Sequence, residues 1–397
     1  SGRIEQLMSK ILSIIIPTYN AEKFLNKGLS SFLVCRDTDA QTAQHNCKMA
    51  TEGRFEEIDI DKAILDKLEV IVVNDGTPDR SVEVAQKFVD WYPDTFVIVN
   101  KTNGGHGSAI NTGVEHVSGK YFKVVDADDW VDTLALKKLI TTLQVLEAAQ
   151  EKQDTRVMDA MLMSYTTYDL QKAAKGDIPY EEHLVVPGTK HDKSVDIQNL
   201  GGPYSSQVIA KHFDDVYWGL TFHGILYNTA FYRGLAHKLA EGIFYEDQEY
   251  AAVPMAYADT IYVYDEQLYQ YRIGDVSQSI SMESSLKRLS HYETVIRTLI
   301  AEGGNSEEFA PGGKQIWGIK TAKFIDDYYQ LCLIKNPDKK MLRDRMDKFT
   351  SEIKSADGYI YGLIEKNYKV FRLLNKLHMN EKVYQKVFIP MVHLIRK

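Results

Sequence analysis

The chain has 397 residues, of which 44% are hydrophobic and 26% are charged. This length allows two domains or one large domain with additions, and the composition is typical of a soluble globular protein. The formal net charge of −8 argues against nucleic acid as a partner. Three cysteines without a C-x-x-C pair favour a reducing, cytoplasmic compartment over a disulfide framework. We find no apolar run long enough to span a bilayer.

The first 150 residues alternate short apolar strands with amphipathic helices. Strands are predicted at 12–16, 70–73, 96–99 and 121–125. A helix is predicted after each strand, with Asn20 capping the first and Asp79 the second. Four strand–helix units in succession predict an α/β fold with a doubly wound, mostly parallel sheet.

Polar residues follow all four of these strands: Thr18-Tyr19-Asn20, Asp75, the loop Asn103-Gly104-Gly105-His106-Gly107, and Asp126 to Asp129. Ligands of such sheets bind at the carboxyl ends of the strands. The sequence therefore predicts one binding site at this edge of the sheet.

The remaining chain divides by pattern. The first part, 10–150, contains a polar insertion at about 35–67, partly helical near 60–65. Residues 151–285 mix short strands, at 158–166 and 261–264, with polar loops, and we expect a second half there that holds an acceptor. Residues 286–397 are predicted to be helical.

The end of the chain is basic and amphipathic. Residues 366–397 carry eight lysines and arginines and one acid, Glu381. Phe371, Leu374 and Leu377 recur at helical spacing. Such a tail is typical of a surface that binds an anionic membrane. In the cytoplasm, this would be the inner face of the membrane. The alternative, slightly favoured because apolar stripes are usually core, is a helix pair docked on the acidic body.

Three carboxylates stand within four positions at the end of the fourth strand: Asp126, Asp128 and Asp129. Acids crowded at a strand end repel one another, and a divalent cation with oxygen ligands relieves the repulsion. Asp129 or Asp132 could instead cap the helix expected from Leu134. Taken alone, the cluster leaves both interpretations open.

Three segments in order resemble the family-2 glycosyltransferases, whose fold is called GT-A: LSIIIPTYNAEKFL, EVIVVNDGTPD and NKTNGGHGSAINTGVEHVSGKYFKVVDADDW. The resemblance is specific over about residues 11–135, looser to about 285, and does not cover the helical end. It implies a nucleotide-sugar donor, bound by the 10–150 half, and Mn²⁺ or Mg²⁺.

The resemblance also implies roles at the donor. Pro17, Thr18 and Tyr19 match the loop around the nucleotide base, and Asp75 matches the acid that reads the base, usually uracil. Asp128 is expected to bind the metal directly, and Asp126 to face the ribose or to reach the metal through water. Asn111 matches a donor-site position, but Ile110 stands where many relatives have arginine. Asp75 has a second interpretation as a turn residue before Gly76.

Further roles come from the second half. Glu246-Asp247 resembles the motif whose aspartate is the general base of inverting members, with Glu246 beside it orienting the acceptor; both could instead cap the helix 248–257. Arg272, Ser277 and Ser279 lie in a segment that grips the diphosphate in relatives, and for Arg272 a surface salt bridge is equally expected. His223 and Trp218 are candidates for acceptor contact, or for core.

The resemblance implies an inverting transferase that adds one sugar to a glycan or a lipid-linked acceptor. Two rivals differ in class. A sugar nucleotidyltransferase needs a glycine-rich, arginine-containing loop after the first strand, where this chain has Pro17-Thr18-Tyr19-Asn20. A non-catalytic scaffold of the same fold would lack the carboxylates, which this chain retains.

Overall fold

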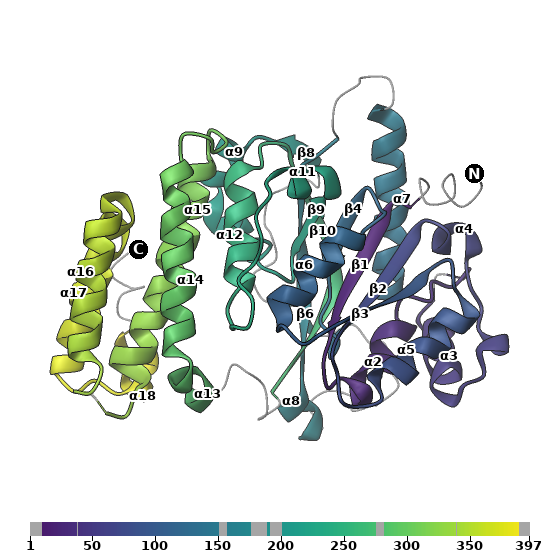
Figure 1. Cartoon of the computed structure of the whole chain (residues 1–397), viewed down its shortest axis with the longest axis horizontal. Helices are drawn as coiled ribbons and strands as arrows, with labels where there is room; N and C mark the ends of the chain where they lie inside the picture. Colours follow the sequence, from purple (N-terminus) through teal and green to yellow (C-terminus); the bar gives the residue numbers. More distant parts are fainter. Residues whose placement is uncertain are drawn as a thin grey trace.

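The computed structural model describes residues 10–37, 39–150, 157–175, 189–190, 201–274, 282–338 and 340–388. A ten-stranded sheet forms the centre, helices cover it, and long helices from the last third of the chain stand beside it (Figure 1). The strands are β1 Leu12–Thr18, β2 Leu68–Asp75, β3 Phe96–Lys101, β4 Tyr121–Val124, β5 Trp130–Val131, β6 Ala160–Asp169, β7 Thr189–Lys190, β8 Gly201–Tyr204, β9 Ile225–Asn228 and β10 Ile261–Ile273.

The α-helices alternate with these strands at first and then follow one another. They are α2 Glu22–Ser30, α3 Ala40–Glu52, α4 Lys62–Leu65, α5 Ser81–Trp91, α6 His106–His116, α7 Thr133–Gln150, α8 Leu170–Ala174, α9 Ser206–Lys211, α10 Phe213–Val216, α11 Thr229–Gly234, α12 Asp247–Tyr257, α13 Met282–Lys287, α14 Leu289–Glu302, α15 Gly313–Tyr329, α16 Arg343–Ala356, α17 Gly358–Lys376 and α18 Glu381–Val383. Short 3-10 turns occur at Phe55–Glu57 and Gly303–Asn305, and π-helical turns at Gln330–Lys335 and Tyr384–Phe388.

The first four strands form the parallel half of the sheet, in the order β3-β2-β1-β4. Ile14 and Ile16 of β1 pack into one hydrophobic core and Ile15 into the other, because successive side chains of a strand point to opposite faces. Each fully buried isoleucine contributes roughly 1.5–3 kcal/mol. The α/β class and the mostly parallel sheet predicted from the sequence are confirmed.

The second half continues the same sheet. β9 lies antiparallel between β4 and β6, and β10 runs parallel to β6. β5 pairs antiparallel with Tyr269 and Gln270 of β10, directly after the acidic loop. β10 is longer than the strand predicted at 261–264, and Arg272 is its penultimate residue. The acidic loop is therefore fixed against the end of β10.

Three predicted helix caps have different outcomes. Asn20 is not the cap of α2: the capping position is Ala21, while Asn20 has a φ of 52° and donates its N–H to Thr77 Oγ1. Asp79 is not the cap of α5 either: the capping position is Arg80, and Asp79, one residue earlier, accepts the N–H of Ser81 at 3.1 Å. Asp132 accepts from the N–H groups at 134 and 135, both at 2.9 Å, and caps α7. Because Asp132 caps α7, Asp129 is available for the candidate site.

The insertion and the chain end are both helical. The insertion holds α3 and α4, of which only α4 was predicted. Helices α14 to α17 enclose a third core, which includes Phe371 and Leu374 of α17. These two side chains favour the docked form of the tail, whereas Leu373 and Leu377 on the same helix are 56% and 66% exposed. Residues 389–397 of the tail lie outside the described residues.

Gly113 of α6 marks the closest approach of a helix to the sheet. A Cβ added there would lie 2.4 Å from Ile15 Cγ2. We expect Gly113→Ala to lower the free energy of unfolding by about 1–3 kcal/mol, because overpacking outweighs the gain in helix propensity. Thermal unfolding followed by circular dichroism measures this loss.

Gly362 of α17 provides the matched control, since nothing lies within 4 Å of its added Cβ. Gly362→Ala should stabilise by about 0.5–1 kcal/mol through helix propensity alone. Equal melting shifts for the two variants would contradict the close packing of α6 on β1.

Candidate functional site

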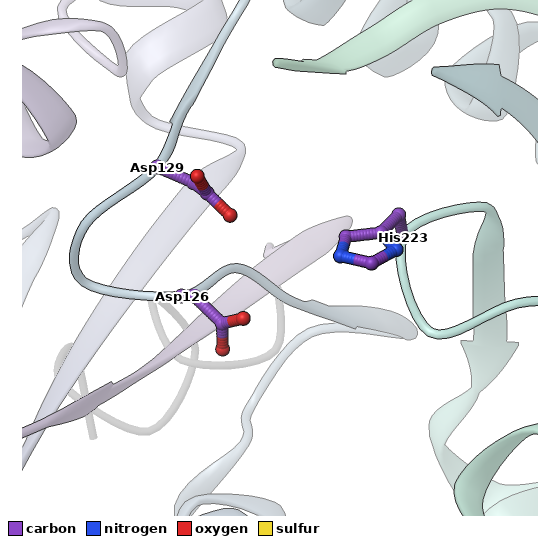
Figure 2. A group of neighbouring side chains, drawn as sticks. All are labelled: Asp126, Asp129 and His223. Carbon is purple, nitrogen blue, oxygen red and sulfur yellow. The ribbon is translucent and has the colours of Figure 1, made fainter. Parts of the chain in front are cut away.

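The acidic loop between β4 and β5 forms the centre of the candidate site. Asp126 and Asp129 close a turn in which the Asp129 N–H donates to the Asp126 carbonyl at 3.0 Å. The imidazole of His223, from the loop before β9, faces both carboxylates (Figure 2). One ligand atom from each of these three residues lies within 4.8 Å of the others. The loop therefore brings together oxygen and nitrogen ligands suited to a divalent cation.

The pKa values of the three acids shift in different directions. Burial alone would raise the pKa of Asp126, but the neighbouring His106 outweighs it and the pKa lies below its usual value. Burial, with the charge of Asp126, raises the pKa of Asp128, and burial together with both neighbours holds the pKa of Asp129 well above its usual value. Three acids that cannot all ionise without a compensating charge fit a cation, which favours the charged form of each.

Asp128 and Asp129 are both tied to β10. Arg272 donates from Nη2 to Asp128 Oδ2 at 3.1 Å, and its backbone N–H donates to Asp129 Oδ1 at 2.7 Å. Tyr269 donates its hydroxyl to Asp129 Oδ2 at 2.6 Å. The guanidinium also lies 3.7 Å from the ring centre of Phe24 on α2. Arg272 is thus held as a fixed, largely buried cation at the acidic loop, which is more than a surface salt bridge.

His223 is enclosed by aromatic rings. Its ring stacks on Tyr271 with centroids 4.2 Å apart and meets Tyr269 edge-on at 4.8 Å. Burial lowers the pKa of His223 to about 4, so the imidazole is neutral and can serve as a ligand. Below it, the buried Lys123 of β4 donates to the His223 carbonyl at 2.6 Å and fixes the loop.

His106, at the start of α6, joins the acidic loop to the Glu246–Asp247 turn. Its Nε2 lies 2.8 Å from Asp126 Oδ1, and its Nδ1 lies 2.6 Å from Glu246 Oε1. Burial alone would lower the pKa of His106, but the two carboxylates outweigh it and the pKa lies well above its usual value. The ring is therefore an imidazolium that donates to both acids.

Glu246 and Asp247 stand at the beginning of α12. The Glu246 side chain makes no capping hydrogen bond to the helix, in contrast to the alternative considered from the sequence, and contacts His106 instead. Burial and the charge of Glu246 raise the pKa of Asp247 to about 6, although Gln248 and Lys320 oppose the rise. A carboxylate that takes up a proton near neutral pH suits a general base.

The residue before this turn is strained. Tyr245 has a φ of 76°, in the left-handed region that non-glycine residues rarely adopt. Its ring packs on Tyr292 of α14 with centroids 3.9 Å apart. Phe244 donates its N–H to His291 Nδ1 of α14 at 3.1 Å. Contacts from the C-terminal helices therefore hold the backbone that presents Asp247.

Asp75 serves the glycine loop in this structure. Its carboxylate accepts the N–H groups of Gly104 and Gly105, at 2.9 and 2.8 Å, and the ammonium of Lys101 at 2.6 Å. Gly242 donates its N–H to the Gly104 carbonyl at 2.8 Å. The glycine loop thus docks on the segment before Glu246, and contact with a base by Asp75 stays a prediction.

The other candidates from the sequence are dispersed around this centre. Pro17 and Thr18 are buried at the end of β1, and Tyr19 is 51% exposed beside them. Asn111 uses its amide on Leu239 O, Glu241 Oε1 and the Leu239 N–H, so in this structure it fixes the loop before α12. Trp218 is partly buried against Tyr217, with the rings edge-on. Ser277 and Ser279 lie outside the described residues.

Two residues of the site were missed by sequence reasoning. His106 was only part of a glycine-rich loop, and nothing local indicated that its partners are 20 and 140 positions away. Lys320 of α15 is buried, donates to Leu220 O at 2.7 Å and faces Asp247 electrostatically. Burial lowers the pKa of Lys320 to about 8. The sequence signal for Lys320 was a lysine among apolar residues in a region predicted to be helical, which indicates a buried charge.

Comparison with known proteins identifies the domain. Residues 60–171 match the family described as Glycosyl transferase family 2. The chain carries a glycosyl transferase family 2 domain. The family resemblance predicted from the sequence is confirmed.

The curated relatives match over part of their length. The uncharacterized glycosyltransferase EpsJ of Bacillus subtilis is 32% identical over 133 residues, which cover 33% of this chain and 30% of EpsJ. The minor teichoic acid biosynthesis protein GgaB, also of B. subtilis, is 31% identical over 119 residues, 30% of this chain and 10% of GgaB. The match therefore spans a third or less of these relatives.

Among solved structures, residues 1–349 of S. aureus TarS, crystallised with UDP-GlcNAc, share the fold. The TM-score is 0.54 at 15% identity, over 93% of this chain and 92% of that chain. The predicted GT-A-like fold is confirmed. The structural match also extends past residue 285, where the sequence resemblance ends. Among the described residues, no helix is both long and apolar enough to cross a membrane.

The raised pKa of Asp247 predicts a stability difference in Asp247→Asn. The folded pKa of about 6 exceeds the ordinary 3.8, so stability falls as the pH rises from 3.8, where the unfolded carboxyl ionises, and the loss is complete above pH 6. Asp247→Asn should therefore be more stable than wild type at pH 7.5, by about 1–3 kcal/mol. The gain should nearly vanish at about pH 3, where Asp247 is protonated in both the folded and the unfolded protein.

Chemical denaturation at about pH 3, 5 and 7.5 measures this dependence. Asp214→Asn, on an exposed position of α10, is the control and should change stability little at any of these pH values. A pH-independent effect of Asp247→Asn would show that the Asp247 pKa is not raised by folding.

Proposed function

We propose that the chain is an inverting glycosyltransferase that transfers one sugar from a nucleotide donor to a hydroxyl group of a glycan or lipid-linked acceptor. The observation that carries this proposal is the junction at His106. One imidazole contacts Asp126 of the acidic loop and Glu246 of the turn that presents Asp247. The candidate cation ligands and the candidate base thus share one edge of the sheet.

A uridine diphosphate sugar is the proposed donor. TarS, which shares the fold, was crystallised with UDP-GlcNAc. In this chain, Pro17 to Tyr19 at the end of β1 lie next to Asn74 at the end of β2, through the pairing of Thr18 with Asn74. This leaves the exposed ring of Tyr19 beside the proposed base site.

Asp247 is proposed to take the proton from the acceptor hydroxyl. The acceptor oxygen forms a bond to the anomeric carbon on the face opposite the diphosphate, the bond from that carbon to the diphosphate oxygen breaks, and the configuration inverts. Glu246, held by His106, fixes the orientation of the turn. The imidazolium and Lys320 keep Asp247 ionised in part despite its burial.

The departing diphosphate needs positive charge. Asp126, Asp128, Asp129 and His223 would hold Mn²⁺ or Mg²⁺, which supplies Lewis-acid stabilisation of a phosphate leaving group when bound. Arg272 stands at the same loop with a guanidinium suited to phosphate oxygens. Its contact with Asp128 keeps the arginine in place before the donor enters.

A bacterial surface glycan is the proposed class of acceptor. GgaB, which is 31% identical over 119 residues, is named for minor teichoic acid biosynthesis. The aromatic pair Tyr217 and Trp218, in the segment that leads to His223, offers a stacking surface for a sugar ring.

A donor screen tests the proposal. UDP-, GDP- and TDP-sugars are incubated with the protein, with and without Mn²⁺, and free nucleoside diphosphate is measured. We expect metal-dependent turnover with UDP-sugars. Asp247→Asn should lower kcat by about 10²–10⁴-fold, because general-base assistance is lost, while calorimetry shows donor binding retained.

The control variant is again Asp214→Asn, which should leave turnover unchanged. Unchanged turnover in Asp247→Asn would refute the assignment of the base. Turnover that is unaffected by chelation with EDTA would refute the role of the cation.

The chain end is proposed to bring this enzyme to the cytoplasmic face of an anionic membrane. Around the exposed leucines Leu373 and Leu377, the lysines at 376, 382 and 386 are also exposed. Apolar side chains among lysines bind anionic lipid through burial and charge together.

Sedimentation with liposomes containing phosphatidylglycerol tests this role. Leu373→Ser combined with Leu377→Ser should reduce the bound fraction severalfold, because apolar area inserted into the lipid is lost. Val145→Ser on α7, which is 63% exposed in wild type, is the matched control. Equal sedimentation of all three proteins would remove the membrane from the proposal.

A further inference from the structure

His106 joins the donor half to the turn of the base by one hydrogen bond to each side. Asp126 lies 20 positions after it and Glu246 lies 140 positions after it. The Glu246 side chain is 4% exposed, whereas His106 and Asp126 are 35% and 27% exposed. The bridge therefore runs from the open side of the site to a buried carboxylate.

The backbone around His106 is built for this contact. Asp75 holds the N–H groups of Gly104 and Gly105 on one side. On the other side, a Cβ at Gly107 would lie 2.3 Å from the Ala240 carbonyl and 3.0 Å from Glu246 Cγ. Only glycine at 107 lets α6 begin this close to the turn, and the approach sets His106 between the two acids.

The chemistry of the bridge makes it responsive. Each ring nitrogen donates one proton to one carboxylate, so the two hydrogen bonds share one rigid ring. A divalent cation held by Asp126 would neutralise part of the charge on the oxygen that faces Nε2. The hydrogen bond from Nε2 would weaken, and the bond from Nδ1 to Glu246 would strengthen. Because the ring is rigid, a change at Nε2 moves Nδ1 and with it Glu246.

We propose that His106 is a positioning residue that couples occupancy of the donor site to the order of the Glu246–Asp247 turn. The inference rests on the proposed function, since it takes a nucleoside diphosphate with a divalent cation as the ligand of the acidic loop. It adds a direction of control, because the turn of the base becomes ordered for the acceptor when the donor is in place.

Hydrogen exchange of backbone amides 240–250 tests the coupling without any acceptor. In the wild-type protein, UDP with Mn²⁺ should slow exchange in this segment by about fivefold or more. In His106→Gln, calorimetry should show that UDP with Mn²⁺ still binds within a few-fold of wild type. The exchange response should be lost, because one amide nitrogen cannot donate to both carboxylates.

Two further variants make the result specific. Glu246→Ala removes the acceptor of the Nδ1 hydrogen bond without touching the acidic loop, and should also lose the response. It serves as well if His106→Gln does not fold. His116→Gln, at the opposite end of α6, contacts Thr112 O and should keep the full response.

The outcomes separate this inference from the proposed function. If the wild-type protein binds no nucleoside diphosphate, the proposed function and the coupling both fail. If it binds but exchange at 240–250 does not respond, or responds equally in wild type, His106→Gln and Glu246→Ala, the coupling alone is refuted. A purely structural tie would alter exchange in the variants with and without UDP to the same extent.

Discussion

Repulsion among carboxylates is the constraint on which the rest of the structure depends. Five acids gather at one edge of the sheet: Asp126, Asp128, Asp129, Glu246 and Asp247. Burial of such a group is tolerated only when cations and hydrogen-bond donors compensate it. His106, Arg272 and Lys320 supply fixed positive charge at three sides of the group. A divalent cation would neutralise the negative charge that remains on the carboxylates. The cation of the proposed reaction would therefore also relieve the repulsion within the fold.

Hydrogen bonds between buried polar side chains and neighbouring loops place the acids of the site accurately. The Asp75 carboxylate accepts the N–H groups of Gly104 and Gly105, and the Asn111 amide donates to the segment 239–241. Neither residue touches an acid of the site, yet together they fix two loops against each other. A group that must stand within a few tenths of an ångström of its partner needs such support, because a loop alone would not hold it.

The sequence was sufficient for the sheet and for the acids, since both follow from local pattern. Apolar runs that end in polar residues located β1 to β4, and the order of the motifs located Asp126, Asp128 and Asp247. It was insufficient for His106 and Lys320, because their partners come from distant segments and neither residue has a periodic signature. Asn20 failed as a cap because α2 begins one residue later, with Ala21 at the capping position, while Asn20 has a left-handed backbone tied to Thr77 after β2. Pairings between segments are decided by tertiary packing, which propensity does not encode.

The C-terminal helices belong to the same argument. Tyr245 keeps a left-handed backbone only because Tyr292 and His291 of α14 pack beside it, and Lys320 of α15 reaches the side of Asp247. A strained turn costs free energy of the order of 1–3 kcal/mol, which the surrounding packing must offset. The large aromatic core of α14 to α17 provides that packing. The last third of the chain is therefore the support that lets a buried carboxylate be presented at a strained turn, and the family domain of residues 60–171 does not contain it.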